Sequence, residues 1–377
     1  MAEANLADFS APAIQGTIPE RLKGWALDVN RRMQVPQDQV LEIVTQLAIM
    51  FDTGLNLSQA LEVLETQGAT PHLKKFVGTI RQQVEEGRPL SAAMATQSWA
   101  FGPVCLALVQ AGEMTGDLGA MLLKVSEFME REIATKKKVK GAMAYPIFMG
   151  VMAVCVVIFL LTSVFPKFAV MFKDKPDLLP APTKMFMAMS EILQENGLWL
   201  IPSMAVGVAF LVVLMKSPEG RHICDPIFIK MPAFGTLIKA VSLSRSFHVL
   251  GVMMNAGLNV LQAIQLASVV SGNRNFSELW DDTKEKVENG SDISETLLNS
   301  PLIPSAEAAM ISLGERSGTL PIVLEKITHH HEKKVDQAIR AFVAVIEPTM
   351  TIMMGGVVAL IVSSLILPMF KMSSAMK

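Results

Sequence analysis

The chain has 377 residues, of which 51% are hydrophobic and only 18% are charged, and its mean hydropathy is +0.39. This composition is typical of a membrane protein and argues against one large soluble core. A formal net charge of -2 gives no indication of a nucleic-acid partner. The three cysteines include no CxxC pair, so the pattern of a disulfide or zinc framework is absent.

Residues 1–37 are expected to form a loosely ordered lead-in, because prolines and glycines recur through them. The first ten residues lack the basic and apolar regions of a cleaved signal peptide, which predicts that the chain starts in the cytoplasm. A first module of about six amphipathic helices follows over residues 38–145. Within it, Asp38 is a candidate N-cap, Gly54 a candidate left-handed helix end, and Thr70-Pro71 a helix start.

The last helix of this module is predicted to run on into the membrane. No helix breaker lies between Leu118 and Lys140, and an uncharged apolar stretch follows Pro146. Residues 146–166 have about the length that an α-helix needs to cross the hydrocarbon layer, where the backbone must satisfy its own hydrogen bonds. A buried core helix is the alternative. A proline at the membrane entry allows a bend, since it removes one intrahelical hydrogen bond.

The rest of the chain is predicted to cross the membrane twice more. We expect an outer loop over residues 167–197, a second transmembrane helix over 198–215, and a second module over 216–347. A third transmembrane helix over 348–370 and an outer tail over 371–377 complete the chain. Lysines 136–138 and 140 precede the first span and basic residues follow the second, which places both modules on the cytoplasmic side. The same lysines are also interpreted as a contact with lipid headgroups.

The second module repeats the first. The string from Gly54 to Leu61 returns as Gly257 to Ile264, shifted by 203 residues. Further along, a Gly-Glu-x-x-Gly motif occurs once in each copy, and Pro348 answers Pro146. A module of about 130 residues has therefore been duplicated, and both copies end in an apolar stretch. The fold prediction is an all-α polytopic membrane protein with two repeated helical bundles and three transmembrane helices.

The repeated Gly-Glu-x-x-Gly motif has two interpretations. In the first it forms a tight corner between helices, where the glutamate caps the following helix and interacts favourably with the helix dipole. In the second the carboxylate contacts a partner protein or a divalent ion, and Asp117 assists in the first copy. The candidate residues, as turns or as contacts, are Gly54, Gly112, Glu113, Gly116, Asp117, Gly257, Gly314, Glu315 and Gly318, together with the membrane-entry prolines Pro146 and Pro348.

No pattern of catalytic residues is found in the sequence. It lacks a GxxxxGK[ST] phosphate loop, a GxSxG elbow and an HExxH pair. The run His329 to His331 is interpreted as a solvated helix surface, because chelation on a helix favours positions i and i+4. The expected spans hold no ionisable residue, which disfavours a pump or channel. We therefore predict a protein that is not an enzyme and that binds no cofactor or metal.

Small residues in the spans, such as Gly150, favour helix association and a homo-oligomer.

Several spaced motifs in fixed order resemble the type II secretion system F protein family. They are Gln46-Leu47-Ala48, Gly54-Leu55-Asn56-Leu57, Gly87-x-x-Leu90, Gly112-Glu113-x-x-Gly116, Tyr145-Pro146 and Phe165-Pro166-Lys167-Phe168. The resemblance covers residues 38–374 and both copies.

This resemblance implies a platform protein of the bacterial inner membrane, with the outer loop and the C-terminus in the periplasm. It also implies as partners a hexameric secretion or pilus ATPase, pilins or pseudopilins, other inner-membrane assembly proteins, further copies of the chain and the lipid bilayer. A membrane transporter subunit or permease is the alternative function.

Overall fold

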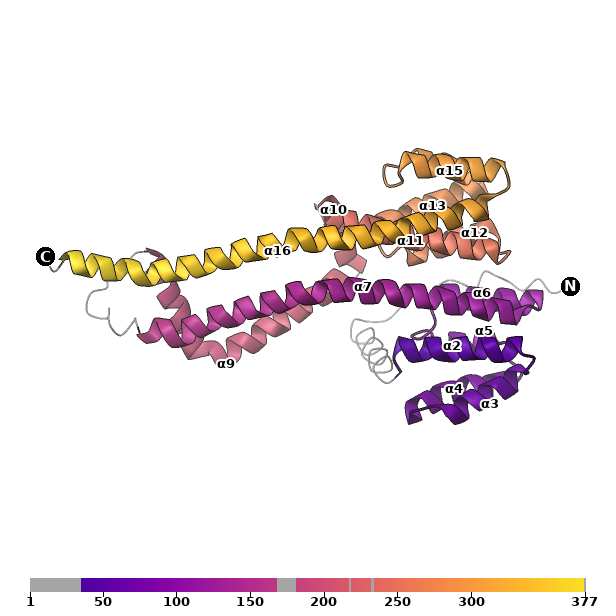
Figure 1. Cartoon of the computed structure of the whole chain (residues 1–377), viewed down its shortest axis with the longest axis horizontal. Coiled ribbons are helices and arrows are strands. Elements are labelled where there is room, and N and C mark those ends of the chain that lie inside the picture. Colours follow the sequence, from indigo (N-terminus) through magenta and orange to yellow (C-terminus); the bar gives the residue numbers. More distant parts are fainter. Residues whose placement is uncertain (1–34, 168–180, 217, 232–233, 376–377) are drawn as a thin grey trace. The chain divides into compact units, whose positions relative to one another are not determined.

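Helices make up almost all of the protein that the computed structural model describes, namely residues 35–167, 181–216, 218–231 and 234–375 (Figure 1). No strand occurs within these ranges, which confirms the all-α prediction. The chain divides into two compact units. The first contains the described residues up to Thr135 together with Val252–Asn259, and the second contains the others.

Six helices between residues 37 and 159 form the first module. They are α2 (Gln37–Asp52), α3 (Leu57–Gln67), α4 (Pro71–Glu85), α5 (Leu90–Ala95), α6 (Pro103–Thr115) and α7 (Leu118–Phe159). A π-helical turn, η2 (Leu160–Val164), continues α7. Helix α7 is 42 residues long and passes through Pro146 without a break, as expected for a helix that leads from the bundle into the membrane.

The second module contains the same six helices in the same order. They are α11 (Phe234–Asn255), α12 (Val260–Val270), α13 (Arg274–Glu288), α14 (Ile293–Leu298), α15 (Ser305–Arg316) and α16 (Leu320–Ala375). Two further helices, α9 (Ala181–Lys216) and α10 (Pro218–Lys230), join the two copies. The duplication of sequence is therefore a duplication of structure.

Left-handed glycines end the helices at equivalent places in the two modules. Gly54 has a φ of 91° and Gly257 a φ of 79°. In the first module the N–H of Gly54 donates to the Phe51 carbonyl and the N–H of Leu55 to the Met50 carbonyl. This pair of bonds is a Schellman motif, which satisfies carbonyls that the helix end leaves free. A residue with a Cβ is strained at such a φ, and this explains the glycine.

The helix starts agree only in part with the sequence patterns. Thr70 caps α4 as predicted, because its hydroxyl accepts a hydrogen bond from the N–H of Leu73 and Pro71 stands at the first helical position. The N-cap of α2 is Pro36, and Asp38 lies inside the first turn instead. The predicted lead-in over residues 1–37 falls almost wholly outside the described residues.

Two segments that were predicted as loop or tail are helical. Residues 181–197 of the expected outer loop belong to α9, and α16 continues to Ala375 through most of the expected tail. Residues 168–180 lie outside the described part of the chain. The prediction of a loop and a tail came from the order of the spans, which says where a segment lies relative to the membrane and not whether it is helical.

Each module has its own hydrophobic core. In the first, Phe76 stacks on Phe101 with ring centroids 5.8 Å apart and meets the edge of Trp99 at 5.5 Å. In the second, the fully buried Phe247 meets the edge of Trp280 at 5.9 Å. Val44 and Val77 hold the equivalent positions of Phe247 and Trp280 in the first copy. The two cores share a backbone plan but are filled by different side chains.

Three described segments are long and apolar enough to cross a membrane: Leu118–Lys167, Leu320–Ser364 and Phe234–Asn255. The first two contain the predicted first and third spans. The third is α11, whose most apolar stretch is half buried, so we assign α11 to the bundle. The predicted second span, residues 198–215, lies within the 36 residues of α9. Its place in the membrane stays a prediction.

Within the second unit, the lower part of α7 packs against α11 and α16. Val139 and Ala142 of α7 contact a buried cluster made by Ala240, Val335, Ala338 and Ile339. The Lys138 ammonium donates to both carboxylate oxygens of Asp336, at 2.9 and 3.1 Å. Lys138 of the predicted basic run thus has a protein partner, in addition to any contact with lipid.

The small residues of the predicted spans differ in their surroundings. A Cβ at Gly150 would lie 3.6 Å from the Met350 side chain, whereas a Cβ at Gly207, Gly355 or Gly356 would meet no atom within 4 Å.

Gly112→Ala is expected to destabilise the protein by about 1–3 kcal/mol, because overpacking forces the two helices apart. A Cβ at Gly112 would lie 2.9 Å from the Met121 Cβ and 3.0 Å from the Leu118 Cα. Chemical denaturation of the purified chain in detergent measures the effect. The matched control is Gly141→Ala, at an exposed helical site where the added Cβ would meet no atom within 4 Å, and this change should stabilise the protein by up to about 1 kcal/mol. Equal effects of the two changes would contradict the close approach.

Candidate functional site

The repeated motif lies at the end of each module where α7 or α16 begins. In the first module the carboxylate of Glu113 accepts hydrogen bonds from the Ser91 N–H at 3.0 Å and the Ser91 hydroxyl at 2.5 Å. Ser91 stands in the first turn of α5, whose own N-cap, Pro89, makes no side-chain hydrogen bond. Glu113 therefore supplies from α6 the acceptor that the N-terminus of α5 lacks.

The second copy repeats this arrangement. The carboxylate of Glu315 accepts hydrogen bonds from the Ile293 N–H at 2.7 Å and the Ser294 N–H at 3.0 Å. These two residues form the first turn of α14, the counterpart of α5. The equivalence shows that the glutamate is retained at one position to satisfy one helix end.

The sequence predicted the wrong helix for this cap. It placed each glutamate at the start of the following helix, α7 or α16, whereas the carboxylates satisfy the preceding short helix. The following helix has its own cap in the first copy, where Asp117 Oδ1 accepts a hydrogen bond from the Ala120 N–H at 3.3 Å. Spacing along the chain could not distinguish the two helices, because both begin close to the glutamate in space.

The two glycines of the motif have separate roles. Gly112 and Gly314 allow close helix contact, since a Cβ at Gly314 would lie 2.8 Å from the Val323 side chain, much as at Gly112. Gly116 and Gly318 adopt left-handed φ values of 77° and 70° and turn the chain into the long helix. The motif is thus a corner between two helices. The first glycine allows the helices to approach closely, the glutamate caps a neighbouring short helix, and the second glycine reverses the chain.

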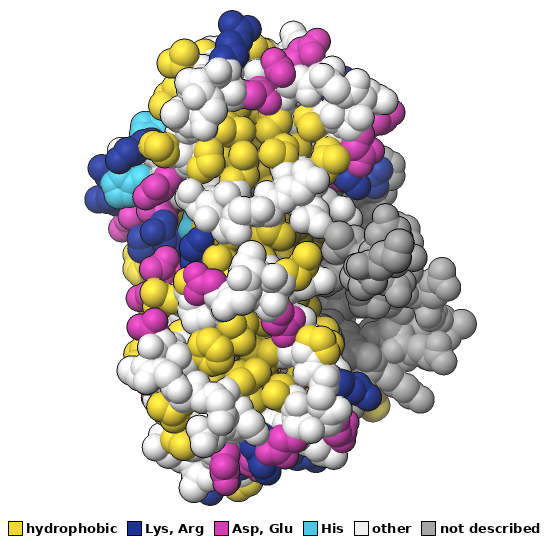
Figure 2. Space-filling view, turned by 90° about the vertical axis from the view of Figure 1, so that its right-hand side faces the viewer, with side chains coloured by type: hydrophobic (Ala, Val, Ile, Leu, Met, Phe, Trp, Pro, Cys, Tyr) yellow, Lys and Arg dark blue, Asp and Glu magenta, His cyan; other side chains and the backbone are white. Residues whose placement is uncertain are grey.

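The carboxylate oxygens of the corner are occupied by hydrogen bonds within the module. Both oxygens of each motif glutamate accept hydrogen bonds from a helix N-terminus. Among the described residues, no group of three or more His, Cys, Asp or Glu side chains could hold a metal ion. Large apolar side chains are exposed at the corner in both copies: Met114 within the first motif is 76% exposed, and Leu313, directly before the second motif, is 71% exposed. Figure 2 shows hydrophobic side chains gathered between polar and charged ones on the face that it draws.

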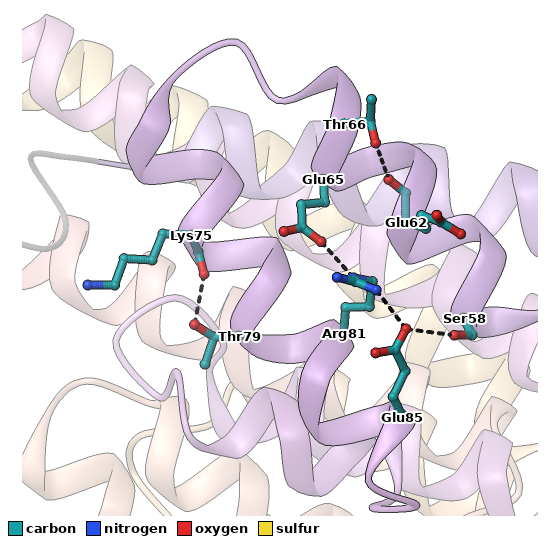
Figure 3. Close-up of polar contacts among 8 residues, drawn as sticks. All are labelled: Ser58, Glu62, Glu65, Thr66, Lys75, Thr79, Arg81 and Glu85. Carbon is teal, nitrogen blue, oxygen red and sulfur yellow. Dashed lines mark hydrogen bonds and ion pairs between the residues drawn. The ribbon is translucent and has the colours of Figure 1, made fainter.

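A polar cluster joins α3 to α4 in the first module (Figure 3). The Arg81 guanidinium donates to Glu65 at 2.6 Å and to Glu85 at 2.7 Å, and the Ser58 hydroxyl donates to Glu85 at 3.4 Å. The hydrogen bond to Glu65 is the main cause of a raised pKa at Arg81. In the second copy Ser268 and Ser277 bond each other at 2.8 Å between α12 and α13. The ion pair of Arg81 with Glu85 has a counterpart in Lys284 and Glu288, 3.6 Å apart, whereas Ser268 stands at the position of Glu65. The polar contacts between these two helices are therefore repeated only in part, unlike those of the corner.

A buried ionic cluster in the second module was missed by the sequence reasoning. His331 is only 1% exposed, and its Nε2 lies 2.7 Å from Oε2 of Glu307. The Lys334 ammonium donates to the other oxygen of Glu307 at 2.7 Å. The prediction of a solvated histidine run is thus wrong for His331, although the side chain of His329 is 69% exposed. A signal was present, since Glu307 replaces a buried Cys105 and His331 a buried Met129 at equivalent positions.

The family model for type II secretion system protein F matches the chain twice, over residues 43–166 and 247–368. The chain belongs to this family. Each match covers one helical module and its continuation into the apolar segment, so the structural repeat and the family repeat coincide.

Named relatives extend over most of the chain. Type IV pilus assembly protein PilC of Thermus thermophilus is 32% identical over 330 residues, which is 86% of this chain and 80% of that protein. The PilC protein of Myxococcus xanthus is 32% identical over 338 residues, covering 90% and 81%. Type II secretion system protein F of Aeromonas hydrophila is 26% identical over 332 residues, covering 88% and 86%. The similarity thus includes both pilus and secretion members of the family.

Removing the carboxylate of the family's Gly-Glu corner tests its structural role. Glu113→Ala should destabilise the protein by about 1–2 kcal/mol, because it leaves the N-terminus of α5 without an acceptor. Glu113→Gln keeps an acceptor oxygen and should lose less. Denaturation midpoints of the purified chain measure both. A Glu113→Ala protein of unchanged stability that fails in the cell would instead favour the interpretation as a partner contact.

The buried cluster predicts a pH dependence for the second module. Burial raises the pKa of Glu307, but hydrogen bonds and charges from His331 and Lys334 outweigh it, so the pKa lies below its usual value. A lowered pKa means that the ionised form stabilises the fold. This contribution is complete above the unfolded pKa of about 4.3 and is lost as the pH falls through the folded value.

Glu307→Gln should therefore cost about 1–3 kcal/mol at pH 7, with a difference from the native chain that narrows below about pH 4. Unfolding curves between pH 3 and pH 7 measure this difference. The exposed Glu85→Gln is the control and should cost less than about 1 kcal/mol. A double change, Glu307→Cys with His331→Met, installs the residues of the first module and should be milder than Glu307→Cys alone. A difference that stays constant down to pH 3 would contradict the assignment.

Proposed function

We propose that the protein is the inner-membrane platform of a type IV pilus or type II secretion machine. In this role it couples a cytoplasmic hexameric ATPase to the assembly of pilin or pseudopilin subunits into a fibre. The observation that carries the proposal is the double match to the family over both modules and their apolar continuations. Relatives named for pilus assembly and for secretion support the same role.

The build of the two modules suits the transmission of movement. In each copy one uninterrupted helix, α7 or α16, leads from the Gly-Glu corner into an apolar segment. An α-helix rises 1.5 Å per residue, so the 56 residues of α16 span about 84 Å, far more than the roughly 30 Å of a hydrocarbon layer. A displacement of the bundle would therefore reach the membrane without crossing a flexible joint.

The proposed topology follows the distribution of basic residues. Both modules, residues 38–145 and 216–347, lie in the cytoplasm, and the C-terminus lies in the periplasm. The spans are residues 146–166, 198–215 and 348–370. The role is mechanical rather than enzymatic, and the partners are the ATPase, pilins or pseudopilins, other inner-membrane assembly proteins and further copies of this chain.

Interrupting α7 tests the mechanical role. Inserting Gly-Gly-Ser after Gly141 breaks the helix between the first module and its span, next to a residue at which an added Cβ would meet no atom within 4 Å. The altered chain should still co-purify with the ATPase but should not restore fibres or secretion to a strain that lacks the gene. The same insertion between Arg88 and Pro89, in a turn between helices, is the control and should be tolerated.

Two results would contradict the proposal. One is normal piliation and secretion in the strain that lacks the gene. The other is full activity of the chain with α7 interrupted, which would show that no rigid connection to the membrane is needed.

A further inference from the structure

The first half of α9 packs across the ends of α7 and α16 that lie away from the modules. Phe186 of α9 contacts Phe165 with ring centroids 5.6 Å apart, within a buried cluster that also holds Leu161 and Ile361. The Ser190 hydroxyl donates to the Leu161 carbonyl at 2.5 Å, inside the π-helical turn of η2. A π-helical turn disturbs the α-helical bonding pattern, and the serine satisfies a carbonyl there.

The contacts fix the direction of this helix relative to the spans. The hydroxyl of Thr183 donates to the Ser364 carbonyl of α16 at 2.7 Å, whereas Ser190 bonds Leu161 of α7. Positions 161 and 364 are almost equivalent in the repeat, so the two contacts lie at the same depth. Seven residues of helix rise about 10 Å, which is the usual distance between packed helices. Residues 183–190 therefore run across α7 and α16, and Figure 1 shows the first turns of α9 crossing them.

The exposed side chains of α9 between residues 183 and 199 separate into two stripes. One stripe is apolar, with Met185, Met189, Ile192 and Trp199 between 44% and 79% exposed. The other is charged, with Lys184, Glu191 and Glu195 exposed about a quarter turn away. The remaining face, which includes Thr183, Phe186 and Ser190, is buried against α7 and α16. A helix that stood free in water would not expose an ordered apolar stripe of this length.

The depth of the crossing matches the boundary of the bilayer. Leu161 lies six residues before Lys167, the first charged residue after the apolar stretch of α7, and Ser364 lies seven residues before Lys371. At 1.5 Å per residue, both contacts lie about 10 Å from Lys167 or Lys371 along the helix, on the side of the apolar stretch. Amphipathic helices at a membrane surface bury their apolar face about 5–10 Å into the region between headgroups and acyl chains.

We propose that residues 183–195 form an interfacial helix that lies in the plane of the bilayer across the ends of α7 and α16. Its apolar stripe inserts into lipid, its charged stripe faces the headgroups and water, and Trp199 anchors the start of the descending span. After the change of direction that Figure 1 shows within α9, the chain continues into the uncharged stretch of residues 196–215. This direct connection to a predicted span favours lipid as the occupant of the apolar stripe. A second copy of the chain or a partner transmembrane helix would be the other occupants.

Nitroxide scanning in proteoliposomes tests the assignment without any partner protein. On a full chain with Cys105, Cys155 and Cys224 each changed to Ser, labels are introduced singly by Met185→Cys, Met189→Cys and Ile192→Cys. The matched set is Lys184→Cys, Glu191→Cys and Glu195→Cys. The ratio of accessibility to oxygen over a nickel chelate should be several-fold higher for the first set, because oxygen concentrates in lipid.

Three outcomes would overturn the proposal. Equal, high accessibility of all six labels to the nickel chelate would mean that the helix stands in water. Equal, high accessibility of all six to oxygen would mean that it continues the transmembrane helix. Protection of the apolar set from both reagents, with spin coupling between labels, would mean that a second copy covers the stripe.

Tryptophan fluorescence gives a second measurement on the chain with its own cysteines. The signal that disappears in Trp199→Phe should be quenched most by lipids brominated near the headgroup end of the acyl chain. The signal that disappears in Trp280→Phe should not be quenched, because Trp280 is 0% exposed inside the second module. Absence of lipid quenching for Trp199 would overturn the proposal even if the cysteine-free chain failed to fold.

Discussion

The need to satisfy backbone hydrogen bonds at helix ends and inside the membrane governs this structure. The described residues contain helices and no strands, so each helix end leaves N–H or C=O groups that need partners. At one end of each module the carboxylate of Glu113 or Glu315 accepts hydrogen bonds from the first turn of a short helix. Where helices end, glycines with positive φ turn the chain so that backbone N–H groups can bond the last helical carbonyls. In the apolar segments long uninterrupted helices solve the same problem, and Ser190 supplies a donor where a π-helical turn disturbs the pattern.

A comparison of the two modules shows which residues this constraint retains in both copies and which residues have diverged. The glycines and glutamates of the corner recur in both copies, because their backbone angles, close approach and charge allow few replacements. The interiors have diverged: Cys105 and Met129 of the first copy correspond to Glu307 and His331 of the second. A buried ion pair contributes little net stability compared with apolar side chains of similar volume. The second module therefore holds an ionic contact that depends on protonation at positions where the first module buries Cys105 and Met129.

The same constraint connects the modules to the proposed function. A platform that passes movement from a cytoplasmic motor to the membrane needs a stiff element whose two ends are both held. Helix α7 starts at the corner beside Gly112, and its continuation beyond η2 ends in the cluster that contains Phe165 and Phe186. In the second unit, Lys138 and Asp336 hold α7 and α16 together between these ends. The crossing segment of α9 would then act as a brace at the membrane surface.

The sequence by itself determined the duplication, the all-α class, the helix ends at Gly54 and Thr70, and the continuous helices through Pro146 and Pro348. These depend on local periodicity, on glycine's freedom at positive φ and on the charge-free stretches, all of which are written along the chain. Only the tertiary structure decided which helix Glu113 caps, that His331 is buried against Glu307, and that residues 181–197 are helical. These outcomes depend on which distant segments meet in space, and a donor's partner 22 residues away, or a helix stabilised by packing, leaves no periodic trace in the sequence.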